Sequence, residues 1–263
     1  MRKFTSIKIE KRAGVTTLWL SRPEAKNALN LQMATEIIEA LQEISTNGSR
    51  MLIIRGEDNL FSAGADLHWM LNDTLPVEQQ IQTLLPKVLF SIYELNIPVL
   101  CIIERFALGG AIGLASVCDY IYAEAETTFS LPEVSLGLVP AVILPFLLSR
   151  GHAPAIRQLA LSAQKIKAAQ AVRHGLADFI FKKGDEKDIE QLITVLMENA
   201  PEATGKTKAL IRSLHTERIN EEIQRSGGIL DEIRKSKEAA EGISAFFEKR
   251  TPSWVHKHEQ NDE

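Results

Sequence analysis

Hydrophobic positions in the N-terminal part of the chain alternate between strand-like and helix-like spacing. Stretches rich in β-branched residues at 5–10 and 15–20 surround an Ala-Gly pair, which predicts a hairpin. Apolar side chains recur at helical intervals in residues 31–45 and 77–95. Continuous apolar runs predict buried strands at residues 51–55, 98–103, 119–123 and 127–130. This recurrence of strands and helices favours a layered α/β domain over a helical bundle.

The C-terminal part follows a different pattern, because nearly everything from residue 183 to residue 250 has helical spacing and dense charge. Ile219, Ile223, Ile229 and Ile233 are spaced for one face of a helix. A mostly polar helix with such a narrow apolar stripe often packs on another subunit or on the main domain. We therefore divide the chain near Ala200 into a core, residues 1–200, and a helical region, residues 201–263, whose polar end is expected to fray.

Composition excludes several classes of protein. The chain has 263 residues, 45% of them hydrophobic and 24% charged, with a formal net charge of −4, as in a globular protein with a full core. The slight acidity gives no reason to expect nucleic acid or a membrane surface as a partner. Two cysteines cannot build a disulfide scaffold or a four-ligand zinc site.

Targeting signals and membrane spans are not indicated either. The charged start of the chain is not followed by the apolar run of a signal peptide. The apolar stretches at 106–123 and 134–148 contain an aspartate and two prolines, respectively, so we interpret both as buried core. A cytoplasmic or organelle-matrix location is expected, and cytoplasmic is the default.

Two glycine-containing turns are candidates for backbone chemistry. FSAGADLHWM at 61–70 follows one predicted buried strand, and ALGGAIG at 107–113 follows another and opens an apolar helix. Taken singly, the first is read as a tight turn with Asp66 capping a short helix, and the second as close helix packing. Taken together, they can aim two backbone N–H groups at one point, which is the geometry of an oxyanion hole. Neither matches a dinucleotide or P-loop fingerprint.

Glu133 is a lone carboxylate between apolar stretches. A buried carboxyl group has a raised pKa and can act as acid or base near neutral pH. The alternative is an exposed glutamate at a helix start after Pro132. The six histidines form no H-x-x-x-H or H-E-x-x-H pattern, so no metal site is expected, and His256 and His258 are expected to be solvated in the polar tail. A serine nucleophile is poorly supported, because G-x-S-x-G is absent.

Four ordered stretches together resemble the enoyl-CoA hydratase/isomerase, or crotonase, superfamily. They are RPEAKNALN (22–30), FSAGADL (61–67), ALGGAIGLASVCD (107–119) and FSLPEVSLGLVP (129–140), and AFFEKR (245–250) is similar to the C-terminal signature of that family. The resemblance implies a crotonase-type ββα superhelix in which residues 201–263 form a helical trimerisation region. It also implies a homotrimer or homohexamer.

The resemblance further implies an acyl-CoA thioester substrate, with coenzyme A as part of the substrate and no separate cofactor. The backbone N–H groups of Ala63 and Gly110 would hold the thioester oxygen, and Glu133 would be the catalytic acid and base. The implied contacts to coenzyme A are Lys26, Ala28, Asp66 and Leu67, with Phe246 and Lys249 reaching the coenzyme A of a neighbouring subunit.

One departure from the family pattern bears on the reaction. Typical hydratases of the family carry a second glutamate three positions after the oxyanion glycine, where this chain has Gly113. We favour a hydratase that adds water to a trans-2-enoyl-CoA. A 3-enoyl to 2-enoyl isomerase that uses Glu133 alone, and a CoA-binding protein with vestigial catalysis, remain alternatives.

Together, FSAGADLHWM at 61–70 and the stretch at 134–148 more closely resemble the branch of the family that hydrates methylglutaconyl-CoA and related branched substrates in leucine and isoprenoid breakdown. Such a substrate brings its own carboxylate and needs a cationic or N–H partner. Arg150, His152 and His68 are the candidates.

Overall fold

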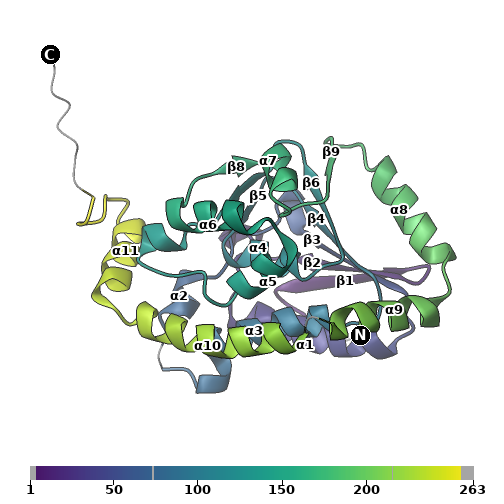
Figure 1. Cartoon of the computed structure of the whole chain (residues 1–263), viewed down its shortest axis with the longest axis horizontal. Coiled ribbons are helices and arrows are strands. Elements are labelled where there is room, and N and C mark those ends of the chain that lie inside the picture. Colours follow the sequence, from purple (N-terminus) through teal and green to yellow (C-terminus); the bar gives the residue numbers. More distant parts are fainter. Residues whose placement is uncertain (1–3, 73, 215, 256–263) are drawn as a thin grey trace, which may run out of the picture.

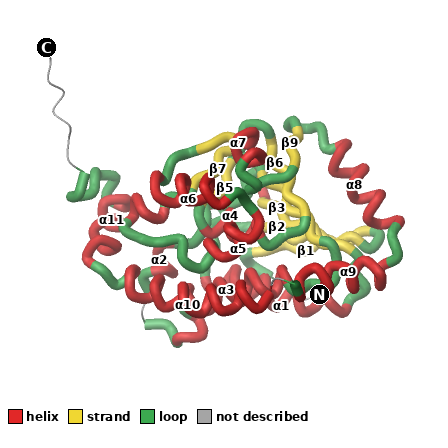
Figure 2. Tube along the Cα trace, in the orientation of Figure 1, coloured by secondary structure: helices red, strands yellow, loops and turns green. Residues whose placement is uncertain are grey.

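The computed structural model describes residues 4–72, 74–214 and 216–255 and has mixed α/β architecture (Figures 1 and 2). The predicted hairpin forms the edge of a six-stranded sheet in the order β1-β2-β3-β4-β6-β9. Strand β1 is antiparallel to β2, and every other neighbouring pair in this sheet is parallel. Its strands are β1 (Ile7–Arg12), β2 (Val15–Leu20), β3 (Met51–Gly56), β4 (Val99–Ile103), β6 (Tyr120–Glu124) and β9 (Phe179–Phe181).

A second, three-stranded sheet lies beside the first and has the order β5-β7-β8. Its strands are β5 (Phe106–Leu108), β7 (Thr128–Ser130) and β8 (Ile166–Lys167). The chain passes from the large sheet to the small one at β4 to β5 and again at β6 to β7. After β3 it makes the same transition through a parallel bridge between Ser62 and Ala107. The repeated unit is therefore a strand of the large sheet, then a strand of the small sheet, then a helix.

Helices cover both faces of the large sheet (Figure 1). The α-helices are α1 (Leu31–Thr46), α2 (Leu67–Met70), α3 (Ile81–Tyr93), α4 (Gly110–Ser116), α5 (Leu144–Arg150), α6 (Ala153–Ser162), α7 (Ala168–Arg173), α8 (Lys187–Glu198), α9 (Pro201–Ser213), α10 (Thr216–Arg234) and α11 (Lys237–Phe247). The 3-10 helices within the described residues are η1 (Pro23–Ala25), η2 (Glu57–Asn59), η3 (Val77–Gln79) and η4 (Glu133–Leu136).

The alternation of side chains along β3 divides the core into two clusters. Leu52 and Ile54 belong to the main cluster with α1 and α3, whereas Met51 and Ile53 belong to a smaller cluster on which α8 packs. Because both faces are covered, the central parallel strands β3, β4 and β6 are mostly apolar, which is why the sequence shows them as nearly continuous apolar runs rather than alternating ones.

Most predicted elements are confirmed. The hairpin forms, with β1 starting two residues later than predicted, and residues 106–123 and 134–148 contribute mainly to the buried core. The helix predicted for 77–95 is divided at Gln80 into η3 and α3. Strands β5 and β8 were not predicted, because three and two residues are too few to show a period. No helix of the described residues is long and apolar enough to cross a bilayer.

The apolar stripe predicted on the C-terminal helix is partly wrong. Ile219 and Ile223 are buried as expected, but Ile229 is 46% exposed and Leu230 takes its place on the buried face of α10. Helix α9 begins at Pro201, one residue after the predicted boundary, and the assignment of residues 201–263 to oligomerisation stays a prediction. The predictions for the tail histidines His256 and His258 concern residues outside those the structure describes.

Candidate active site

The small sheet sets three turns side by side. Ser62 bridges to Ala107 of β5, and Leu108 of the same strand pairs with Ser130 of β7. The Leu108 N–H donates to the Ser62 carbonyl at 3.3 Å, and the Gly109 N–H donates to the Ser130 carbonyl at 2.9 Å. The turn after Ser62, the start of α4 and the start of η4 therefore lie together, although they are far apart in the sequence.

The first of these turns is held by the segment that contains Lys26 and Leu29. The Leu29 N–H donates to the Gly64 carbonyl at 2.8 Å, and the Leu29 carbonyl accepts from the Asp66 N–H at 2.8 Å. The Ala63 N–H donates to the Lys26 carbonyl at 3.0 Å. The prediction that Ala63 supplies an oxyanion donor is therefore wrong, because its N–H already has a partner inside the protein.

Ala65 takes the place predicted for Ala63. Leu29 forms its two backbone hydrogen bonds with the Gly64 carbonyl and the Asp66 N–H. The N–H of Ala65, which lies between them, takes no part in this pairing. A Cβ built on Gly110 would lie 3.3 Å from the Ala65 nitrogen, so the two residues are close neighbours. Gly110 is the first residue of α4, and an N–H at that position has no partner within its helix. Among the described residues no acceptor is found for either N–H, and the pair can bind one oxygen.

The position of Lys26 and Leu29 relative to the 62–66 turn decides which alanine, Ala63 or Ala65, has a backbone N–H available for a ligand. The two alanines are equivalent in the sequence pattern, since both flank Gly64. Gly64 itself has a φ of +92°, and a Cβ there would lie 2.3 Å from the Leu108 carbonyl oxygen, so only glycine allows this close approach.

Glu133 is buried at the start of η4, with 9% of its surface exposed. Its carboxyl group lies against the second glycine turn, because a Cβ on Gly109 would be 2.6 Å from Oε1. The other oxygen, Oε2, is buried with no hydrogen-bond partner among the described residues. Burial raises the pKa of Glu133 from 4.5 to about 7, and only its own backbone N–H opposes this shift. The predicted burial of Glu133 is thus confirmed and the alternative of an exposed residue is excluded, whereas its role as an acid stays a prediction.

Ile143 fills the space beside Gly113. A Cβ on Gly113 would lie 2.2 Å from Ile143 Cγ2, and both residues are buried. The place beside position 113, for which the sequence resemblance implies a second carboxylate in typical hydratases, is therefore occupied by a branched apolar side chain. Sequence reasoning identified Gly113 as a departure but did not identify Ile143 as its counterpart.

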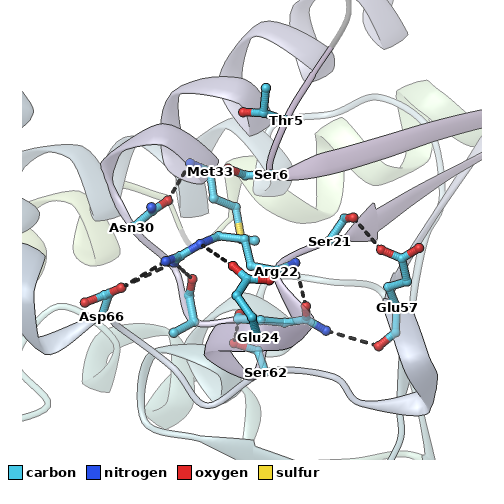
Figure 3. A network of polar contacts seen from close by, with 12 residues as sticks. Thr5, Ser6, Ser21, Arg22, Glu24, Asn30, Met33, Glu57, Ser62 and Asp66 are labelled. Carbon is cyan, nitrogen blue, oxygen red and sulfur yellow. Dashed lines mark hydrogen bonds and ion pairs between the residues drawn. The ribbon is translucent and has the colours of Figure 1, made fainter.

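Two of the residues predicted to contact coenzyme A, Ala28 and Asp66, bind Arg22, which sequence reasoning did not single out; Figure 3 shows Arg22 facing Asp66. Arg22 Nη1 donates to the Ala28 carbonyl at 2.6 Å and to Asp66 Oδ2 at 3.3 Å. Asp66 Oδ1 accepts from the His68 N–H at 3.0 Å and so caps α2 as predicted. Both carboxylate oxygens of Asp66 are therefore used within the protein, and Arg22 holds the 22–30 segment against the turn that carries Ala65.

The remaining predicted contacts lie around this segment or at the end of α11. Lys26 is exposed with φ of +53°, Ala28 and Leu67 are half-buried, and Phe246 and Lys249 are exposed at the end of α11. Their roles in binding stay predictions.

The three candidates for binding a substrate carboxylate lie in different places. Arg150 donates to the Cys118 carbonyl at 2.8 Å and forms an ion pair with Asp178, so its guanidinium is committed elsewhere. His152 is exposed at the start of α6. His68 is exposed and stacks on Phe247 with 4.7 Å between ring centroids. The described residues contain no cluster of three or more His, Cys, Asp or Glu suited to a metal ion.

Comparisons with known proteins agree on one family. The sequence model of the enoyl-CoA hydratase/isomerase family matches residues 10–257. The chain is 30% identical to a crotonyl-CoA hydratase of Syntrophomonas wolfei over 267 residues, covering 97% of this chain and 99% of that protein. It is 27% identical to the 2,3-dehydroadipyl-CoA hydratase of Escherichia coli over 249 residues, covering 94% of this chain and 97% of that protein.

A solved structure of an enoyl-CoA hydratase from Mycobacterium avium has a similar fold. It superposes with a TM-score of 0.86 at 26% identity, covering 96% of this chain and 100% of the other.

Proposed function

The chain belongs to the enoyl-CoA hydratase/isomerase family, and we propose that it hydrates a trans-2-enoyl-CoA through an enolate held by the Ala65 and Gly110 amides. Its mixed α/β fold is of the crotonase type, as the resemblance implied. The observation that carries the proposal is the position of Glu133, a buried acid beside the turn that ends in the Gly110 donor.

The two amides supply the electrostatic part of the mechanism. As water adds to the β-carbon, negative charge moves onto the thioester oxygen, and two fixed N–H donors stabilise it there. Losing one donor of this kind costs about 3 kcal/mol of transition-state stabilisation. The donors belong to the main chain, so their contribution does not depend on the side chains at these positions.

Glu133 supplies the proton transfers. Because its pKa is about 7, the protonated and ionised forms are both populated near neutral pH. In its protonated form one oxygen gives its proton to the α-carbon, while the other oxygen takes a proton from the attacking water. The carboxyl group ends the step protonated on the second oxygen, and the hydroxyl group and the new hydrogen lie on the same face of the product. The unpaired Oε2 supports this division between the two oxygens.

Isomerisation of a 3-enoyl-CoA to a 2-enoyl-CoA is the second candidate, and the contact between Gly113 and Ile143 favours it. A typical hydratase has two carboxylates, and here the second position is filled by an apolar side chain. Moving one proton from the α-carbon to the γ-carbon needs one base and the same oxyanion donors.

Several features of the substrate and assembly belong to the same proposal. The commitment of Arg150 to Asp178 leaves it no free charge for a substrate carboxylate, which favours an uncharged acyl group over the methylglutaconyl type. We expect coenzyme A to be the only non-protein group required, carried in by the substrate. We also expect a homotrimer or homohexamer in which the exposed Phe246 and Lys249 reach a neighbouring site.

A substrate pair tests the proposal. Incubation with crotonyl-CoA should remove the absorbance of the conjugated thioester, and incubation with a 3-enoyl-CoA should create it if the enzyme is an isomerase. The matched control is Glu133→Gln, which keeps the shape of the side chain and loses the acid. Conversion of neither substrate would favour the remaining alternative, a CoA-binding protein with vestigial catalysis.

A further inference from the structure

Helix α11 meets the turn that carries Glu133 through two glycines. A Cβ on Gly242 of α11 would lie 2.4 Å from the Leu136 carbonyl carbon of η4. A Cβ on Gly137, which ends η4, would lie 2.4 Å from the Glu238 carbonyl oxygen of α11. Each glycine thus faces the backbone of the other element, and no side chain separates the two backbones.

The start of the same 3-10 helix carries the catalytic carboxyl group. Glu133 is its first residue, and the Glu133 carbonyl accepts from the Leu138 N–H at 2.9 Å. Because η4 contains only Glu133–Leu136, a displacement at its C-terminal end is transmitted to Glu133. The carboxyl group has little room to move back if η4 is displaced, because Oε1 packs closely against Gly109. A Cβ built on Gly109 would lie only 2.6 Å from Oε1.

The far end of α11 reaches the other half of the site. Phe247, its last residue, stacks on His68 of α2 with 4.7 Å between ring centroids. Helix α2 follows directly after the turn with Ala65 and is capped by Asp66. Helix α11 therefore contacts both the element with the acid and the element next to an oxyanion donor, and Figure 1 shows it at the same end of the molecule as α2.

We propose that Gly242 is a positioning residue for the proposed reaction, through which α11 sets the distance between the Glu133 carboxyl group and the substrate held by the Ala65 and Gly110 amides. This inference rests on the proposed function. A misplacement of about 1 Å in such a site can cost about 100-fold in rate, although the displaced group never contacts substrate.

The experiment compares Gly242→Ala with Gly228→Ala. The added methyl group at 242 overlaps the Leu136 backbone, so α11 or η4 must move. At Gly228 of α10 nothing lies within 4 Å of the added Cβ, which makes it a matched helical control. We expect Gly242→Ala to lower kcat by about 10-fold to 100-fold with KM for the enoyl-CoA changed less than about 3-fold. Gly228→Ala should leave both unchanged.

A pH profile separates positioning from a general loss of structure. If η4 shifts and water reaches Glu133, the pKa in the kcat profile should move from about 7 toward its ordinary value of 4.5, whereas loss of folded protein would scale the whole profile without shifting it. Rates are therefore expressed per folded molecule, measured by circular dichroism. Wild-type kcat in Gly242→Ala would overturn the inference.

A milder variant covers the case in which Gly242→Ala does not fold. Ile243→Val removes one methylene from a buried residue of α11 and loosens its docking without any backbone overlap. A lower kcat at constant KM supports the inference, and an unchanged kcat contradicts it. The proposed function fails separately, because it requires Glu133→Gln to lose activity whatever Gly242→Ala does.

Discussion

Ile143 and Gly113 are complementary, since Ile143 Cγ2 lies 2.2 Å from the place where a Cβ at Gly113 would be. Neither residue can change alone without a cost. A side chain at 113 requires a smaller residue at 143, and a smaller residue at 143 alone leaves a cavity in the buried core. The pair fills the space in which a second carboxylate would stand, so among the described residues Glu133 is the acid that we propose for the site.

Installing that second carboxylate should therefore need two substitutions. We expect Gly113→Glu to destabilise the protein by several kcal/mol, because it forces a large polar side chain into the space of Ile143. The double variant Gly113→Glu with Ile143→Gly should recover much of that stability and hydrate crotonyl-CoA at least as fast as the wild type. Urea unfolding and the crotonyl-CoA assay measure the two effects.

The control for this pair is Ile143→Gly alone, which creates the space without the carboxylate and should lose stability with no gain in hydration. If Gly113→Glu alone were as stable as the wild type, the space beside Gly113 would not be closed by Ile143.

Replacing Glu133 tests the proposed mechanism most directly. Glu133→Gln should lower kcat by about 100-fold or more and leave the affinity for an acyl-CoA ester nearly intact, because the proton transfer is lost and the binding contacts remain. Steady-state kinetics give kcat, and calorimetric titration with a saturated acyl-CoA gives the affinity. Equal turnover by the variant would remove Glu133 from the mechanism.

Sequence reasoning found the two glycine turns, the buried strands before them and Glu133, since each has a local signature. It assigned one donor to Ala63 and did not consider Ala65. The difference between them depends on the Lys26 carbonyl, which accepts from the Ala63 N–H, and that contact is visible only in the structure. It also could not find Ile143 or Arg22 as partners of the site, since both come from segments that only tertiary packing brings to Gly113 and Asp66. Contacts of this kind leave no period or spacing in the chain.

Amide hydrogen exchange distinguishes the two alanines. On binding a non-reactive acyl-CoA thioester, the N–H groups of Ala65 and Gly110 should exchange more slowly, because each gains an acceptor. The Ala63 N–H should change little, because it already donates to Lys26 at 3.0 Å. NMR with resolved amide signals measures all three, and selective protection of Ala63 would restore the original assignment.

Removing one of these donors should also slow the reaction. Gly110→Pro deletes the N–H at the first position of α4, where proline is otherwise well accommodated. We expect kcat to fall by about 100-fold to 1,000-fold, the usual effect of losing one oxyanion donor. A fully active Gly110→Pro enzyme, shown to be folded by its unfolding midpoint, would contradict the role of this amide.

The raised pKa of Glu133 also predicts how stability depends on pH. A folded-state pKa of about 7 against an ordinary value of 4.5 means that the folded protein binds a proton that the unfolded chain releases. The associated stability is complete below about pH 4.5 and is lost as the pH rises through about 7. At about 1.4 kcal/mol per pKa unit, the loss approaches about 3 kcal/mol. In Glu133→Gln the side chain stays neutral, so this contribution is absent.

Urea unfolding of both proteins between pH 5 and pH 8.5 isolates this effect, because all other titrating groups are shared. The free energy of unfolding of the wild type should fall relative to that of Glu133→Gln as the pH rises across this range. The fall should be steepest at pH 5–7, because there the folded protein keeps a proton on Glu133 that the unfolded chain has released. If the difference instead stayed constant, Glu133 would titrate alike in both states. The carboxyl group would then be hydrated in the folded protein, and its pKa would stay near the ordinary value of 4.5. A group with that pKa is almost fully ionised at neutral pH and cannot supply the proton that the proposed mechanism needs.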